Sequence, residues 1–145
     1  MTETEFRVKH SELIEYYQLI EMRLKGICAA VLADEEKGWF ERLSDYDSDP
    51  FGKLLKLIKD LQKEKDISVF AQEELDALNQ LRLCRNYWVH QCFACAERIT
   101  FKKGEVAKKG AAVQLHRDYE DAFEWDKKLT ETECKLHRGN PFIGM

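Results

Sequence analysis

Arg85, Asn86 and His90 lie inside a segment of this chain, residues 81–96, whose other side chains are mostly apolar. The sequence of the segment is LRLCRNYWVHQCFACA, and as a helix it carries an apolar side chain in nearly every direction. A helix that is apolar on all sides is normally a buried, central one. Burying a guanidinium, an amide and an imidazole without partners is costly. The segment therefore predicts either a satisfied polar network or a cleft that these three side chains line.

The composition favours an all-helical domain. Only 7 Gly and 2 Pro occur in 145 residues, too few for the many turns of a β-sandwich or barrel. Hydrophobic residues make up 44% and charged residues 34%, as in ordinary globular proteins. We predict a single domain over residues 1–145, an all-α up-down bundle of four or five helices with a long central helix that carries the Arg85–His90 motif.

Apolar residues recur at helical spacing in five stretches, which are separated by polar or glycine-containing breaks. Ser11 is expected to cap the first helix. Residues 100–110 are polar and basic, and they predict a loop or a small hairpin. The predicted helices cover residues 10–33, 39–46, 51–63, 68–99 and 113–136.

Charge and cysteine content indicate the compartment. The net charge of −4 argues against a surface that coats nucleic acid, but it leaves room for a local basic site. No apolar run approaches the roughly 18 residues of a membrane span, and the stretch MTETEFRVKH lacks the apolar core of a signal peptide. Five cysteines, an odd number, favour reduced thiols. We expect a cytoplasmic protein with no membrane contact.

The polar residues of the motif helix share one side of it. At about 100° per residue, they fall within a wedge of about 80°. The members of this wedge are Asn79, Arg82, Asn86, His90 and Glu97. Arg85 lies about 100° away from Asn86, so a straight helix cannot aim Arg85 and His90 at one point. Either a bend near the motif or a twofold partner would bring them together, and we predict a homodimer with a composite site.

An arginine and a histidine in one cleft suit phosphodiester chemistry. The guanidinium holds a phosphate and offsets the charge of the transition state, and an imidazole titrates near neutrality and can transfer protons. We predict Arg85, Asn86 and His90 as catalytic residues, with Asn86 either orienting His90 or hydrogen-bonding the phosphate, and with no metal or cofactor needed. Arg82 and four lysines are the candidates for RNA binding. Those lysines are Lys102, Lys103, Lys108 and Lys109.

The run from Arg85 to His90 also resembles the R-x4-H motif, with Asn after the Arg, of HEPN domains (higher eukaryotes and prokaryotes nucleotide-binding). The resemblance implies a metal-independent endoribonuclease, commonly a homodimer, of toxin–antitoxin or other defence systems, with an antitoxin or nucleotidyltransferase as a possible partner. Arg85 and His90 would be its catalytic pair and Asn86 the accompanying polar residue. One subfamily has a Tyr that is nucleotidylated two positions after the His. This chain has Cys92 there, so the resemblance does not imply that modification.

Other interpretations of these residues stay open. Arg85, Asn86 and His90 could form a buried network in a non-catalytic interaction module, or one that binds nucleotide or RNA without cutting it. The four lysines could be an ordinary solvated loop. Cys92 and Cys95 form a C-x-x-C pair, but a second pair is missing, which favours packing over a zinc site. The run Asp45, Asp47 and Asp49 lacks the Gly and Glu of a calcium loop, and we interpret it as a solvated turn.

Overall fold

The computed structural model describes residues 1–46 and 50–140 and confirms the all-α prediction. Over these described residues the chain forms five α-helices, a π-helical turn, η1, and a two-stranded hairpin. In chain order the elements are α1 (Glu3–Leu32), α2 (Trp39–Ser44), α3 (Phe51–Glu64), α4 (Gln72–Asn86), η1 (Tyr87–Gln91), β1 (Phe101–Lys102), β2 (Glu105–Val106) and α5 (Ala111–Gly139).

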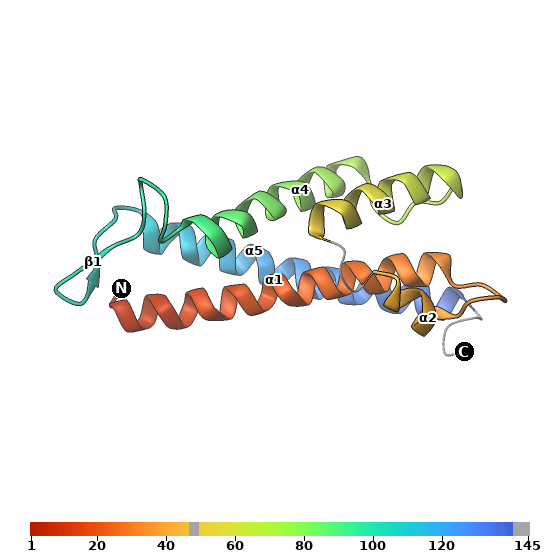
Figure 1. The fold of residues 1–145 in the computed structure, drawn as a ribbon, viewed down its shortest axis with the longest axis horizontal. Coiled ribbons are helices and arrows are strands. Elements are labelled where there is room, and N and C mark those ends of the chain that lie inside the picture. The colour runs from red at the N-terminus through yellow and green to blue at the C-terminus, as the bar shows by residue number, and fades with distance from the viewer. Residues whose placement is uncertain (47–49, 141–145) are drawn as a thin grey trace.

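The two longest helices, α1 and α5, pack side by side and run in the same direction (Figure 1). At one end, the Glu3 N–H donates to the carbonyl of Gly104, in the hairpin that precedes α5, at 2.8 Å. At the other end, the Asn140 amide donates to the Ala30 carbonyl at 2.9 Å. Helix α4 runs the opposite way, with α3 beside it. The motif segment therefore reaches the end of the bundle that holds the N-terminus and the hairpin.

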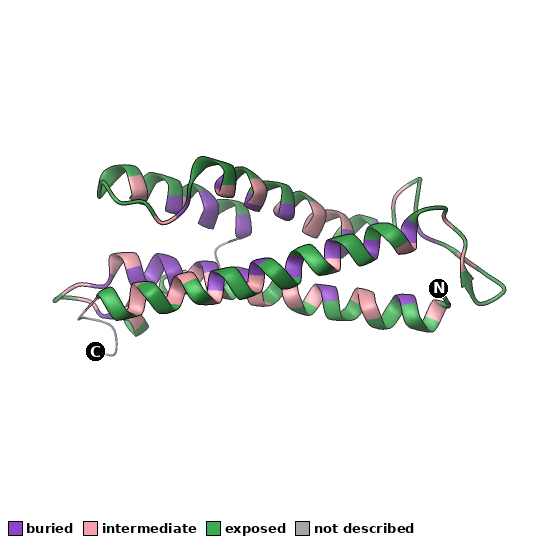
Figure 2. Ribbon diagram, turned by 180° about the vertical axis from the view of Figure 1, so that it is seen from behind, coloured by how far each residue is buried: buried purple, intermediate pink, exposed green. Residues whose placement is uncertain are grey.

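The core forms where α1 and α5 face each other and the α3–α4 pair (Figure 2). Along α1 the buried residues recur three and four positions apart, the spacing of one helix face. They include Phe6, Leu13, Tyr17, Ile20, Leu24 and Ile27 on α1, and Leu115, Ala122 and Leu129 on α5. This face of α1 is what the apolar periodicity of residues 10–33 predicts.

Helix α1 begins earlier than predicted. Thr2, rather than Ser11, is its N-cap: the Thr2 hydroxyl accepts the Glu5 N–H at 3.1 Å. The Glu5 carboxylate in turn accepts the Thr2 N–H at 2.9 Å, which completes a capping box. The added turns bury Phe6 and bring His10 inside the helix. The prediction of a start at His10 was wrong because Thr2-x-x-Glu5 is the stronger cap.

The motif helix is shorter than the predicted range 68–99. It begins at Gln72 because the side-chain amide oxygen of Gln62, Oε1, accepts the backbone N–H groups of Val69 and Phe70, which holds that stretch as a loop. After η1 the chain folds back, and the Ile99 N–H donates to the Cys92 carbonyl at 2.6 Å. Both residues enter the core there.

The predicted burial of the motif helix on all sides was wrong. Leu81, Trp88 and Cys92 are buried, whereas Leu83 is 46%, Val89 38% and Phe93 37% exposed. One face of the segment packs, and several of its apolar side chains lie open to solvent.

The remaining local predictions have mixed outcomes. Residues 100–110 contain the predicted hairpin, in which Phe101 pairs with Val106 and Lys102 with Glu105. Asp45 forms an ion pair with Lys37, with 2.8 Å between Oδ2 and Nζ. Asp47 and Asp49 lie outside the described residues. Over residues 1–46 and 50–140, none of the helices has the length and apolar character that crossing a membrane would need.

Candidate functional site

The Arg85–His90 motif spans the junction between α4 and the π turn η1. The Cys92 N–H donates to the Tyr87 carbonyl at 2.8 Å, an i→i+5 bond in place of the i→i+4 bond of an α-helix. Single π turns within α-helices frequently lie at functional sites. A π turn holds more residues per turn than an α-helix, so the angle between Arg85 and His90 around the segment is smaller than the angle of about 140° in a straight α-helix. The two side chains nevertheless have different surroundings: Arg85 faces Glu21 on α1, whereas His90 is exposed.

His90 lies within η1 and its side chain is exposed. In the described part of the chain it has no hydrogen-bond, ion-pair or ring partner. An enclosed histidine that belonged to a structural network would need such partners, because a buried imidazole without them is costly. His90 is therefore a surface group whose ring is open to solvent.

Arg85 is more enclosed and is already engaged. Its side chain is 25% exposed, and Nη2 lies 3.7 Å from Oε2 of Glu21 on α1. Nη1 donates to Oδ1 of Asn86 at 3.3 Å. The guanidinium therefore faces α1 and pairs with a carboxylate. It has five N–H donors, and these contacts use only some of them. A second anion could share it, in competition with Glu21.

The predicted RNA-binding cations fall into three settings. Lys102, Lys103 and Lys109 are exposed, on the hairpin and just before α5. Lys108 donates to the Glu97 carbonyl at 2.8 Å, and its ammonium lies 5.8 Å from the centre of the Tyr87 ring. Arg82 instead lies near α3: its Nε donates to Asn79 at 3.0 Å, and its side chain covers Gly52. The structure thus brings Lys108 to the π turn and leaves Arg82 one helical turn or more from it.

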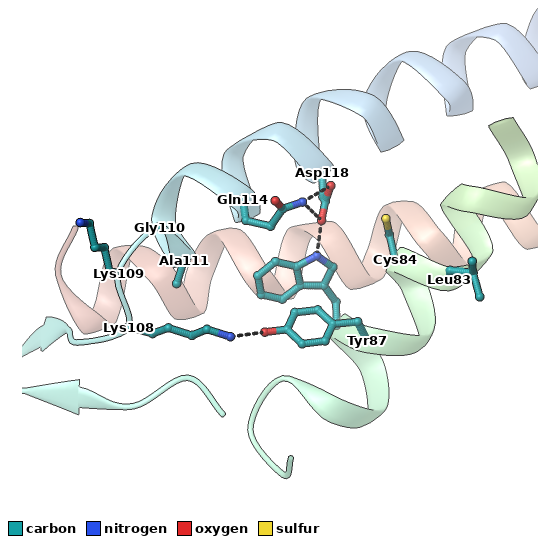
Figure 3. A pocket seen from close by; sticks show the side chains of 10 residues that line it. Leu83, Cys84, Tyr87, Lys108, Lys109, Gly110, Ala111, Gln114 and Asp118 are labelled. Atoms are coloured by element: carbon teal, nitrogen blue, oxygen red, sulfur yellow. Dashed lines mark hydrogen bonds between the residues drawn. The ribbon is translucent and has the colours of Figure 1, made fainter. Parts of the chain in front are cut away.

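A pocket of about 510 Å³ opens beside the motif, between the end of α4 and the first turns of α5 (Figure 3). At its inner end the Asp118 carboxylate accepts the indole N–H of Trp88 at 2.6 Å and the side-chain amide of Gln114 at 2.9 and 3.0 Å. Its walls are largely apolar; Lys108 points toward Tyr87, and Lys109 lies on the loop before α5 with its side chain directed away. The lining residues are Leu83, Cys84, Tyr87, Trp88, Lys108, Lys109, Gly110, Ala111, Gln114 and Asp118.

The cysteines near the motif are packing residues. Cys92 is 2% exposed and its thiol lies 3.2 Å from the Trp88 carbonyl, to which it donates. Burial, reinforced by Asp118, raises the pKa of the Cys84 thiol, so this cysteine stays protonated and is a poor nucleophile. Within residues 1–46 and 50–140, no three His, Cys, Asp or Glu side chains gather into a possible metal site.

Sequence reasoning missed two residues of α1 that approach the motif. His10 places Nε2 2.8 Å from the Trp88 carbonyl oxygen, and Glu21 pairs with Arg85. A signal for both was present: they lie four positions after Phe6 and Tyr17, on the buried face of the helix. A polar residue on a buried face needs a partner, and the motif is the partner here.

Comparison with known proteins adds nothing to this geometry. No family model, curated protein or solved structure matches the chain.

Proposed function

We propose that this chain is a metal-independent endoribonuclease of HEPN type, with Arg85 and His90 as its catalytic pair. The observation that carries the proposal is the exposure of His90 within a π turn that begins two residues after Arg85. A histidine that held the fold together would be enclosed, whereas a general base must reach the proton that it removes.

The residues support a balanced reaction on RNA. The imidazole of His90 takes the proton of a ribose 2′-hydroxyl, and that oxygen attacks the adjacent phosphorus. The bond to the 5′-oxygen breaks, and this oxygen leaves with a proton from the second, protonated copy of His90 in a homodimer. Arg85 offsets the charge that develops on the phosphoryl oxygens. The products are a 2′,3′-cyclic phosphate and a 5′-hydroxyl end, with no redox step and no cofactor.

A homodimer is part of the proposal, because one chain supplies a single His90 for two proton transfers. The exposed apolar side chains Leu83, Val89 and Phe93 on the motif segment favour an interface there. The exposed lysines Lys102 and Lys103 are then candidates to bind the RNA backbone. An antitoxin or nucleotidyltransferase stays a candidate partner through the resemblance of the motif alone.

The second candidate is a non-catalytic interaction module. It is favoured by the ion pair between Arg85 and Glu21 and by the bond from Arg85 to Asn86, which give the arginine a structural role. In that case His90 would be an ordinary surface residue, and its replacement would change nothing.

The deciding experiment compares the wild-type protein with His90→Ala and with His116→Ala, which removes an exposed histidine of α5. Cleavage of a mixed single-stranded RNA is measured in excess EDTA, on proteins matched by circular dichroism and melting temperature. We expect cyclic phosphate ends from wild type and His116→Ala, and a loss of about 10²–10⁴-fold in His90→Ala. Equal cleavage by a folded His90→Ala protein, or cleavage that needs magnesium, would overturn the proposal.

A further inference from the structure

The π turn leaves one buried backbone carbonyl without its usual donor. In an α-helix the Trp88 carbonyl would accept the N–H of Cys92, four residues later. Here that N–H donates to Tyr87 instead. Trp88 is 1% exposed, so bulk water does not reach its carbonyl. A buried carbonyl without a hydrogen-bond donor destabilises the fold, so the π turn needs a replacement donor.

His10 of α1 supplies that donor. Its Nε2 lies 2.8 Å from the Trp88 oxygen, a full hydrogen bond to a neutral acceptor, and the Cys92 thiol adds a weaker one at 3.2 Å. The imidazole ring is fixed by two aromatic neighbours: its centre lies 5.2 Å from that of Phe93, edge to face, and 5.9 Å from that of Trp88. The ring is thus held where it can satisfy a carbonyl of a π turn.

We infer that His10 is a positioning residue: by bonding the Trp88 carbonyl it holds the π turn and so sets the direction of His90 relative to Arg85. Without this bond, the α-helical arrangement becomes more favourable, because in it the Cys92 N–H donates to the Trp88 carbonyl and satisfies it. His90 then rotates away from Arg85, because each residue of an α-helix turns the backbone further than a residue of a π turn does. His10 itself touches no substrate.

The role of His10 in catalysis rests on the proposed function, whereas its control of the π turn does not. Two variants separate its donor from its bulk. His10→Leu fills the space without an N–H, and His10→Gln keeps an amide N–H. Phe93→Leu removes the ring that orients His10 and leaves its N–H in place. His116→Ala is the matched control, because its side chain is exposed and lies on α5.

The first readout is structural. In nitrogen–proton NMR spectra, His10→Leu should shift the imidazole signals of His90 and the amide signal of Cys92, and should speed the hydrogen exchange of that amide. Phe93→Leu should shift the same signals in the same direction by less. His10→Gln should stay closer to wild type, and His116→Ala should leave these signals unchanged. Unchanged Cys92 and His90 signals in folded His10→Leu and Phe93→Leu would overturn the inference.

The second readout is RNA cleavage. His10→Leu should lower kcat by up to about 100-fold with little change in KM, because a misplaced catalytic group slows the chemical step more than binding. His10→Gln should recover most of that loss. A wild-type protein that does not cut RNA would overturn the proposed function and leave the NMR test of His10 standing. Full kcat in a folded His10→Leu that shows the NMR shifts would overturn the catalytic role of the π turn.

Discussion

The carboxylate of Asp118 on α5 accepts the indole N–H of Trp88 at 2.6 Å, in a place where Asp118 is 7% and Trp88 1% exposed. The backbone carbonyl of the same tryptophan is held by His10 on α1. One residue of the π turn is therefore tied to both long helices. The position of the motif depends on these two hydrogen bonds as well as on apolar packing.

Asp118→Asn should lower the free energy of unfolding by about 1–2 kcal/mol. The amide is a weaker acceptor for the Trp88 N–H, and it brings a second donor toward the Gln114 amide. Urea denaturation at neutral pH measures the loss. Asp121→Asn is the control: burial and the nearby Asp118 raise the pKa of Asp121, so removing its charge should not destabilise. An Asp118→Asn protein as stable as wild type would contradict the assigned role.

Glu133 should make stability depend on pH. Burial raises its pKa above the ordinary 4.5, against the opposing effects of Arg23 and His137. Because the folded-state pKa is the higher one, the protonated form favours folding. The stabilisation that this raised pKa gives the folded protein is fully present below about pH 4.5. It is lost as the pH rises through the raised pKa of Glu133.

The variant Glu133→Gln keeps the shape of the side chain and removes its charge. Its free energy of unfolding, relative to wild type, should therefore increase as the pH rises from 4.5 to 7. Denaturation series at several pH values test this, with the exposed Glu131→Gln as the control. The opposite trend with pH would mean that the weak pairs of Glu133 with Arg23 and His137, at 3.9 and 3.7 Å, outweigh burial.

Gly26 on α1 leaves room for the carboxylate of Glu133, which reaches it from α5. A Cβ added there would press on the Glu133 carboxylate, so Gly26→Ala should bring none of the usual gain of alanine over glycine in a helix. In a Glu133→Ala background, the same change should stabilise by about 0.5–1 kcal/mol. A double-mutant cycle by thermal or urea unfolding measures the coupling. Equal effects of Gly26→Ala in both backgrounds would show that the contact imposes no constraint.

Glu21 should compete with RNA phosphate for Arg85. Their ion pair is long, at 3.7 Å, so Glu21→Gln should change the free energy of unfolding by less than about 1 kcal/mol. Under the proposed function, the freed guanidinium should lower the KM for RNA by roughly 2- to 5-fold, the size of such a pair. Initial rates at low salt are the measurement. A higher KM would mean that Glu21 orients Arg85 for its substrate.

The hairpin lysines should contribute binding without sequence preference. Replacing Lys102 and Lys103 together by Ala should weaken RNA binding for all sequences and reduce the slope of log affinity against log salt by roughly 1.4, for two lost single-strand phosphate contacts. Filter binding with the His90→Ala protein avoids cleavage during the measurement. The control is Lys56→Ala with Lys59→Ala, two exposed lysines of α3. Identical slopes in all proteins would remove the hairpin from the RNA site.

Local patterns predicted most of the secondary structure. The apolar spacing along α1, α3 and α5 indicated helices, and the basic stretch with glycine indicated the hairpin. The boundaries of the motif helix were not predicted, because they depend on single hydrogen bonds between residues that are apart in the sequence. Gln62 holds the segment before Gln72, and the contact of Ile99 with Cys92 ends the helical path. No periodicity encodes such bonds.

The sequence by itself determined that the chain is helical and that Arg85, Asn86 and His90 stand out in an apolar setting, since residue type and spacing carry both facts. Only the tertiary structure decided that His90 is open to solvent while Arg85 faces Glu21. The winding of the backbone between these two residues depends on a donor that lies 78 residues away in the sequence, His10. Whether an imidazole faces solvent or the core depends on which other elements of the fold pack against its helix. The sequence of that helix alone does not contain this information.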